Sequence, residues 1–166
     1  VMENRSIVSL LDERMWHMSE YISFSVTAKV ATINIDRPKL RNAFNPEMIS
    51  CFSQLLDEVT SRDDVKVLVL RAEGKSFCAG ADLNWLKSVK DYSFEENLAD
   101  AQELADLMEK LFKLPKPTIG RIQGDAVGGG AGMVAALDVV VAAERAHFSF
   151  SEARLGMAPS VISPYL

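Results

Sequence analysis

The segment Val65–Leu70, with the sequence VKVLVL, is the feature that most constrains the fold of this chain. It is a short, nearly unbroken apolar run rich in β-branched residues, which is typical of a strand buried on both faces of a parallel sheet. Neighbouring strands in such a sheet need long crossover connections, and these are usually helices. Segments with the spacing of strands and of helices do alternate along the chain. The sequence therefore predicts an α/β domain with largely parallel pairing.

The other expected elements follow from periodicity and from capping residues. Alternating apolar and polar residues predict a hairpin of two strands near the start of the chain, turning near residues 27–29. Asn45 followed by Pro46 has the pattern of a helix N-cap and a first helical residue, and Ser93 caps a second, longer helix. The expected strands are 22–26, 30–35, 65–70, 118–122, 139–142 and 147–150, and the expected helices begin near Pro46 and Leu83 and run over 94–112 and 133–137.

The length of the chain indicates how many domains it forms, and its charge and apolar content argue against several classes of protein. The 166 residues fit one domain, with residues 1–17 expected as an N-terminal extension and 18–166 as the core. The net charge is −5 and Lys and Arg form no cluster, which argues against a nucleic-acid partner. No stretch approaches the roughly 20 apolar residues that cross a membrane. The two cysteines, Cys51 and Cys78, fit a reducing compartment, so a cytoplasmic protein without a metal site is expected.

Two glycine-containing loops each follow an expected strand and precede a helix. They are residues 76–83, SFCAGADL, and residues 124–132, GDAVGGGAG. Small residues there let a ligand approach the backbone, and the N–H groups at a helix start are unpaired and can bind an anion. Two such loops on neighbouring strands can direct two amides at one oxygen, which is the geometry of an oxyanion hole. The alternative is that the glycines serve only tight turns and close packing, and composition does not decide between the two.

Glu152 is the acidic residue with the strongest context for chemistry. It follows the segment 148–151, FSFS, and lies just past the end of an expected strand. A carboxyl group in apolar surroundings at such a position suits a proton-transfer role. The alternative is a surface glutamate paired with Arg154, and the residues by themselves favour that alternative.

Four segments together resemble the crotonase superfamily, the enoyl-CoA hydratase/isomerase family. They are 36–38, DRP, with Asn42 and Ala43 after it; 77–83, FCAGADL; 124–132, GDAVGGGAG; and 146–160, AHFSFSEARLGMAPS. Their order and separations match the family together, over roughly residues 21–166. The resemblance implies an α/β fold with a crotonase-like core, a spiral of ββα units.

The resemblance also implies a site for an acyl-CoA. In that family two backbone amides hold the thioester carbonyl, and by position these are the N–H groups of Ala81 and Gly129, with Glu152 as the proton-transfer residue. CoA enters as part of the substrate thioester, so no separate cofactor is expected. Family members imply a homo-oligomer, a trimer or a hexamer. The other residues expected to bind substrate are Ala79, Gly80, Asp82, Leu83 and Gly128, with Lys39 and Arg41 against the CoA phosphates.

The chain departs from the family's hydratases at Gly132, which stands where they carry the first of two glutamates. With one carboxylate, two schemes remain. Glu152 activates water while another group or water completes the proton path, or Glu152 moves a proton between two carbons, as in a Δ3,Δ2-enoyl-CoA isomerase.

The segment 151–165 resembles a bacterial subgroup of methylglutaconyl-CoA hydratases of leucine and isoprenoid breakdown, in which glycine also fills the position of Gly132. We therefore expect hydration of an α,β-unsaturated acyl-CoA, with 3-methylglutaconyl-CoA as the candidate substrate.

The length of the chain is a second departure. Family members are considerably longer, and we expect a truncated core that lacks the C-terminal helical region, which covers the acyl pocket and builds the trimer in the family. A non-catalytic CoA-binding or oligomerising remnant is the alternative that this length favours. The presence of both glycine loops and of Glu152 argues against it.

Overall fold

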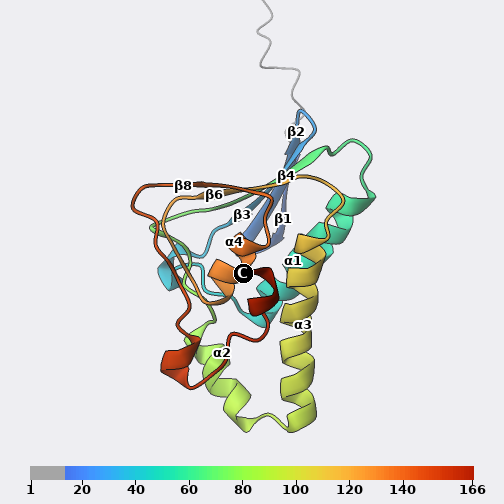
Figure 1. Cartoon of the computed structure of the whole chain (residues 1–166). Helices are drawn as coiled ribbons and strands as arrows, with labels where there is room; N and C mark the ends of the chain where they lie inside the picture. The colour runs from blue at the N-terminus through green and yellow to red at the C-terminus, as the bar shows by residue number, and fades with distance from the viewer. Residues whose placement is uncertain (1–13) are drawn as a thin grey trace, which may run out of the picture.

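The structure, a computed structural model, describes residues 14–166, with side chains from Ser19 onward except that of Leu155 (Figure 1). Its strands form two sheets, one of six strands in the order β1-β2-β3-β4-β6-β8 and one of three in the order β5-β7-β9. The six-stranded sheet contains β1 (Arg14–Ser19), β2 (Ile22–Thr27), β3 (Val30–Ile35), β4 (Val67–Ala72), β6 (Thr118–Ile122) and β8 (Val139–Ala142). The small sheet contains β5 (Ser76–Cys78), β7 (Asp125–Val127) and β9 (Phe148–Ser149).

Four α-helices connect and cover these strands. They are α1 (Pro46–Ser61), α2 (Leu83–Ser88), α3 (Phe94–Phe112) and α4 (Gly129–Ala135). Short 3-10 helices are η2 (Pro38–Leu40), η3 (Val89–Asp91), η4 (Glu152–Leu155) and η5 (Ser163–Tyr165). None of the helices in residues 14–166 has the length and apolar character that a membrane span requires.

The hairpin and the parallel pairing are confirmed. Strands β2 and β3 pair antiparallel across a two-residue turn, in which Ala28 and Lys29 have φ of 50° and 68°. Two central residues with positive φ match the right-handed twist of the flanking strands. The pairs β3–β4, β4–β6 and β6–β8 are parallel, as the apolar run around β4 predicts.

Strand β1 begins inside the segment that was expected to be an N-terminal extension. It pairs antiparallel with β2, so residues 14–17 belong to the sheet, whereas the sequence analysis set residues 1–17 apart from the fold. The pairing joins backbone groups, and β1 sits at the sheet edge, so the pattern of side chains carries little signal of it. Residues 1–13 lie outside the described residues.

The core lies between the large sheet and two long helices. Helix α1 packs beside β1 and β2 and against α3, next to which it lies in Figure 1. The buried side chains of β2, β3 and β4 meet the apolar face of α1 and the C-terminal part of α3. Those of the helices are Met48, Ile49, Phe52, Leu55, Leu56 and Val59 on α1, and Leu107, Met108 and Leu111 on α3.

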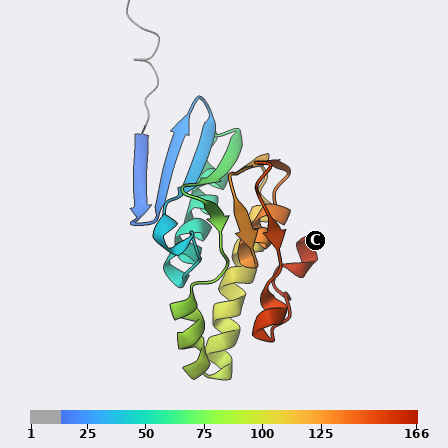
Figure 2. The same ribbon diagram turned by 90° about the vertical axis from the view of Figure 1, so that its left-hand side faces the viewer.

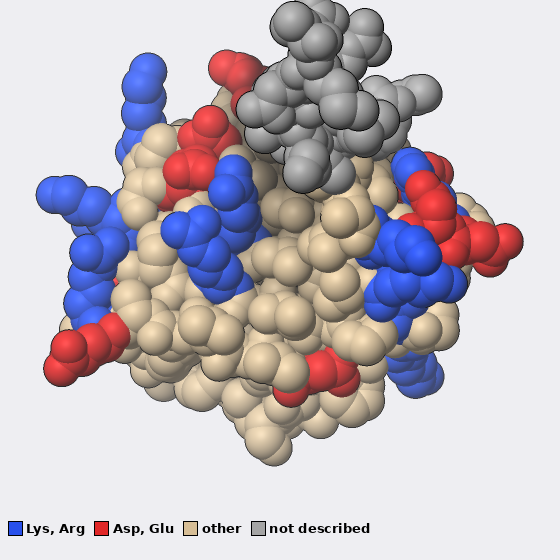
Figure 3. Space-filling model, turned by 90° about the horizontal axis from the view of Figure 1, so that it is seen from above, with Lys and Arg blue, Asp and Glu red and all other residues tan. Residues whose placement is uncertain are grey.

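Charged side chains of both signs are present on the upper face of the molecule. Seen from above, they lie mostly around the rim of an uncharged middle, and Lys and Arg stand beside Asp and Glu (Figure 3). No continuous basic surface is visible on this face of residues 14–166.

Candidate active site

The small sheet gathers the segments that the sequence analysis selected. Strands β5, β7 and β9 are parallel, so their carboxyl ends lie at one edge (Figure 2). In sheets of this kind ligands bind beyond the carboxyl ends of the strands. The loops that follow these strands therefore lie together: residues 79–82 after β5, Gly128 after β7 and residues 150–152 after β9. Strands β5 and β7 were not expected, because three residues are too few to show a period.

The backbone of Ala81 is held beside Phe44 in an isolated parallel bridge. The N–H of Phe44 donates to the carbonyl of Gly80 at 2.7 Å, and the N–H of Asp82 donates to the carbonyl of Phe44 at 2.8 Å. Both hydrogen bonds leave out the N–H of Ala81, for which the described residues provide no acceptor. Gly129 is the first residue of α4, where a helix leaves its N–H groups unpaired.

Two glycines bring the loops into contact. Gly80 and Gly128 have φ of +92° and +55°, a region that residues with a Cβ rarely adopt. A Cβ on Gly128 would lie 3.0 Å from Oε1 of Glu152 and 3.9 Å from the Cα of Gly80. Close packing, the alternative explanation for glycine in these loops, applies to Gly130 of the second loop. A Cβ there would lie 2.7 Å from the Cβ of Cys78.

A cavity of about 510 Å³ opens beside these loops. Helices α2 and α3 form one side of it, and the C-terminal segment from Ser151 to Ile162 forms another. Its polar side chains are few against a mostly apolar wall, which is usual for pockets that bind small molecules. Of the residues expected at the site, those that line it are Ala79, Gly80, Ala81, Leu83, Gly128, Gly129 and Glu152.

Glu152 starts the 3-10 helix η4, directly after the turn that follows β9. Its Oε1 faces the Cα of Gly128, and its Oε2 is buried and has no hydrogen-bond partner in the described residues. No ion pair joins Glu152 to Arg154 in this part of the chain, so the surface-pair alternative is not what the structure shows. An unsatisfied buried carboxylate oxygen costs free energy, and such groups in folded proteins call for an explanation such as a catalytic role.

Gly132 faces Ile162. A Cβ on Gly132 would lie 2.2 Å from Cγ2 and 2.6 Å from the Cβ of Ile162, a side chain that is only 2% exposed. The helix carrying Gly132 and the segment carrying Ile162 therefore approach at a distance that only glycine permits. The place where a second carboxylate would enter from α4 is filled by an apolar side chain.

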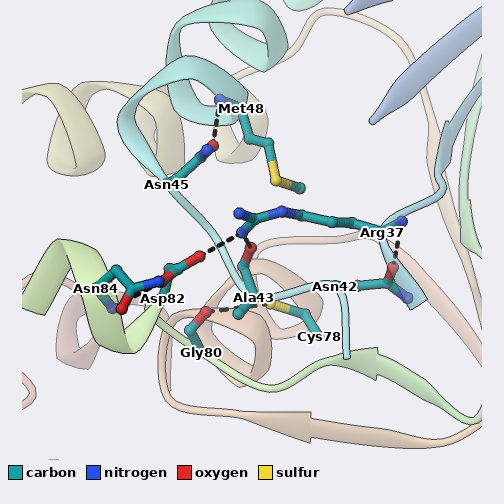
Figure 4. A network of polar contacts seen from close by, with 9 residues as sticks. All are labelled: Arg37, Asn42, Ala43, Asn45, Met48, Cys78, Gly80, Asp82 and Asn84. Carbon is teal, nitrogen blue, oxygen red and sulfur yellow. Dashed lines mark hydrogen bonds and ion pairs between the residues drawn. The ribbon is translucent and has the colours of Figure 1, made fainter. Parts of the chain in front are cut away.

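Three of the expected substrate-binding residues do not line the cavity. Lys39 lies in η2 and Arg41 just after it, and both side chains are exposed. The carbonyl of Arg41 accepts a hydrogen bond from the N–H of Ala79 at 3.0 Å, so this turn adjoins the first loop. The carboxylate of Asp82 is turned to Arg37 instead of the cavity (Figure 4), and it caps α2 by accepting from the N–H of Asn84.

Sequence reasoning missed a polar contact on the cavity wall. The indole N–H of Trp85, on α2, donates to Oδ1 of Asp100, on α3, at 3.1 Å, and both residues line the cavity. In the sequence, Asp100 is one of several acidic residues of the segment 94–112. Its charge alone gives no signal of this contact, because the partner lies on another helix.

We expect lowered pH to weaken the fold through Asp82. Burial by itself would raise the pKa of this carboxyl, but the hydrogen bond from the N–H of Asn84 and the hydrogen bond and charge of Arg37 outweigh it, so the pKa lies below its ordinary value. A carboxyl whose pKa is lowered by folding contributes stability above its unfolded pKa of about 3.9 and loses it as the pH falls through the folded value.

Asp82→Asn should therefore flatten the dependence of the unfolding free energy on pH below about pH 4. Urea unfolding of the two proteins over an acid pH series measures this. An identical acid dependence in the variant and the parent chain would contradict it.

Cys78 should be inert in the folded protein. Both cysteines are free and buried, and burial raises the pKa of the Cys78 thiol to about 12. The thiolate is the reactive form, and near neutral pH almost none is present. In a Cys51→Ser variant, we expect an aromatic disulfide reagent to leave Cys78 unmodified until guanidinium unfolds the chain. Rapid modification under native conditions would show that the loop around Cys78 opens.

Comparison with known proteins agrees with this geometry. The sequence profile of the enoyl-CoA hydratase/isomerase family matches residues 25–166. The chain belongs to this family. A crystal structure of an enoyl-CoA hydratase from Shewanella pealeana superposes with a TM-score of 0.86 at 46% identity, covering 88% of this chain and 55% of that one. The fold is therefore the crotonase fold.

Two relatives in this enoyl-CoA hydratase/isomerase family illustrate its range. A Thermus thermophilus protein, provisionally named an enoyl-CoA hydratase, is 36% identical over 137 residues, which are 82% of this chain and 54% of the relative. The 1,2-epoxyphenylacetyl-CoA isomerase of Escherichia coli is 35% identical over 144 residues, 86% of this chain and 55% of that enzyme. The chain thus spans about half the length of the curated relatives it matches.

Proposed function

We propose that this chain carries the catalytic centre of an enoyl-CoA hydratase, which adds water across the double bond of an α,β-unsaturated acyl-CoA. The observation that carries the proposal is the buried Oε2 of Glu152, which has no hydrogen-bond partner among the described residues and lies at a cavity that Ala81 and Gly129 also line. The membership of the chain in the enoyl-CoA hydratase/isomerase family supports the same chemistry.

In this proposal each group has a separate task. The N–H groups of Ala81 and Gly129 donate to the thioester oxygen, and they stabilise the negative charge that develops there as the enolate forms. The carboxylate of Glu152 accepts a proton from water as the water oxygen attacks the β-carbon. A proton then goes to the α-carbon, either from the protonated Glu152 or through a second water.

The proposed substrate is 3-methylglutaconyl-CoA. The resemblance of the segment 151–165 to methylglutaconyl-CoA hydratases supports it. We further propose that CoA enters with the substrate, that Lys39 and Arg41 contact its phosphates, and that no other cofactor takes part. The homo-oligomer that the family resemblance implies and the cytoplasmic location that the two cysteines favour stay predictions.

A second function is favoured by the packing at Gly132. Since Ile162 occupies the space next to that glycine, no carboxylate enters the cavity from α4 within residues 14–166, and Glu152 is the acid beside Gly128. One carboxylate suffices to move a proton between the α- and γ-carbons of an enoyl thioester. A Δ3,Δ2-enoyl-CoA isomerase is therefore the alternative activity of this site.

Labelled water separates these functions. The chain is incubated in H₂¹⁸O with crotonyl-CoA, with 3-methylglutaconyl-CoA and with a trans-3-enoyl-CoA, and the products are analysed by mass spectrometry. Incorporation of ¹⁸O from the water into the products of the first two substrates supports the hydratase. Conversion of the 3-enoyl-CoA without ¹⁸O supports the isomerase, and binding of CoA thioesters without turnover supports a non-catalytic remnant. A chain that neither binds nor converts any of the three overturns the proposal.

A further inference from the structure

A buried ion pair joins Arg37 to Asp82, a residue of the first glycine loop (Figure 4). Nη1 of Arg37 is 2.6 Å from Oδ2 of Asp82 and 3.0 Å from the carbonyl oxygen of Ala43. The side chains of Arg37 and Asp82 are only 12% and 8% exposed. Neither residue lines the cavity, so neither charge is placed to touch a substrate.

Asp82 is held on three sides, and it directly follows Ala81. Its Oδ2 takes the hydrogen bond from Arg37, and its Oδ1 accepts from the N–H of Asn84 at 2.7 Å, which caps α2. Its own N–H donates to the carbonyl of Phe44 at 2.8 Å. These bonds hold the backbone at Asp82, and the Gly80–Ala81 peptide, which carries the N–H of Ala81, is held by the hydrogen bond from the N–H of Phe44 to the carbonyl of Gly80 at 2.7 Å.

Asn42 holds the backbone of Arg37, the cationic partner of this ion pair. It is fully buried, and its Oδ1 accepts from the backbone N–H of Arg37 at 2.8 Å. Its Nδ2 donates to the carbonyl oxygens of Glu73 and Ser76, each at 2.8 Å. With φ of +58°, Asn42 holds a left-handed conformation that asparagine tolerates better than most residues. The turn carrying Arg37 is thereby tied to Glu73, directly after β4, and to Ser76 in β5, the strand that leads into residues 79–82.

We propose that Arg37, paired with Asp82 and seated by Asn42, is the positioning residue that sets the direction of the Ala81 N–H. The inference rests on the proposed function, in which that N–H donates to the thioester oxygen. A hydrogen-bond donor stabilises a developing charge only if it is held in place before the reaction. Ala81 has no side chain that could anchor it, so its direction depends on its neighbours, Gly80 and Asp82.

Stability alone is a poor explanation of this ion pair. Removing two charges from water costs free energy that their attraction often fails to recover, so apolar residues of similar volume frequently serve a core as well. A buried pair one residue from an unpaired amide is instead suited to specifying one backbone geometry. Lysine in place of Arg37 would keep the charge, but it lacks the planar guanidinium, whose Cζ lies 4.8 Å from the centre of the Tyr21 ring.

The test uses Arg37→Met, Arg37→Lys and Asp82→Asn in the full chain, with Arg62→Met as the matched control. Arg62 pairs with Asp64 at 2.7 Å and with Glu58 at 3.6 Å and does not line the cavity, so the control removes an arginine ion pair outside the candidate site. If Arg37→Met fails to fold, the two milder variants carry the test. Melting temperatures report whether each variant is folded.

Two readouts separate positioning from a merely structural role. Amide hydrogen exchange follows the N–H groups of Phe44 and Asp82, whose hydrogen bonds flank Ala81. The ¹³C chemical shift of butyryl-CoA, labelled at the thioester carbonyl, reports how strongly bound amides polarise that carbonyl. Butyryl-CoA is saturated and cannot be hydrated, so neither readout needs turnover, and the failure of the proposed function would not hide the result.

We expect Arg37→Met to speed exchange at Phe44 and Asp82 by about tenfold or more, and Arg37→Lys and Asp82→Asn to speed it less. The bound carbonyl shift should move back toward that of free butyryl-CoA, and kcat should fall with KM little changed. Arg62→Met should alter none of these. Exchange that is unchanged in a folded Arg37 variant overturns the inference, and so does an unchanged carbonyl shift. If the chain binds no butyryl-CoA, the proposed function fails, and the exchange result alone decides for or against the positioning of Ala81.

Discussion

Replacing Glu152 with glutamine should lower the turnover of enoyl-CoA by about 10²–10⁴-fold, the usual contribution of a general acid–base group. Glutamine has nearly the same shape, but it cannot take a proton from water or from carbon at neutral pH. The fold and the affinity for CoA thioesters should stay the same, because Oε2 makes no hydrogen bond that the substitution would break within the described residues.

The measurement is the loss of enoyl-thioester absorbance, with binding of butyryl-CoA followed in parallel. Glu144→Gln is the matched control, since Glu144 is exposed and lies outside the cavity. Full turnover by a folded Glu152→Gln chain would remove Glu152 from the mechanism. A loss of both turnover and butyryl-CoA binding would instead assign Glu152 to substrate binding.

Adding a single methyl group at Gly132 should destabilise the fold by about 1–3 kcal/mol, the usual cost of overpacking a core. The new Cβ would stand 2.2 Å from Cγ2 of Ile162, far inside van der Waals contact. Ile162 is almost fully buried, so it cannot turn away without moving the segment that forms one wall of the cavity. We expect a lowered denaturant midpoint in Gly132→Ala.

A double-mutant cycle isolates this contact. In the background of Ile162→Ala, which makes room beside α4, the same Gly132→Ala change should cost much less free energy. Gly129→Ala is the control for a methyl group on the same helix, because its Cβ would meet Phe44 at an ordinary 3.7 Å. Equal costs of Gly132→Ala in both backgrounds would show that Ile162 does not cover Gly132.

Much of the fold could be predicted from the sequence, where an apolar period ran over enough residues or a capping residue marked the start of a helix. Helix α3 runs over Phe94–Phe112 behind its Ser93 cap, as expected, and Asn45 caps α1. The strands β5 and β7, of three residues each, could not be predicted, because their pairing depends on neighbours that lie far away in the sequence. Strand β1 was missed because an edge strand is recruited through its backbone.

For the candidate site too, some features could be predicted from the sequence and others could not. The two glycine loops and Glu152 could be named as candidates from local order, with small residues at a strand end and an acid after an apolar strand, and the family resemblance was needed to choose between their alternatives. The turn of Asp82 toward Arg37 and the hydrogen bond from Trp85 to Asp100 were not, since each joins residues on different elements.

The sequence by itself determined the class of fold, the helix caps and the order of the loops that carry the candidate groups, since these depend on neighbours along the chain. Only the tertiary structure decided which of these groups share a cavity and that Ile162 fills the space beside Gly132. It alone also showed that Asp82, the residue after Ala81, forms a buried ion pair with Arg37. The physical reason is that side-chain contacts, burial and pKa arise between segments that the fold brings together, and local residue patterns do not contain those distances.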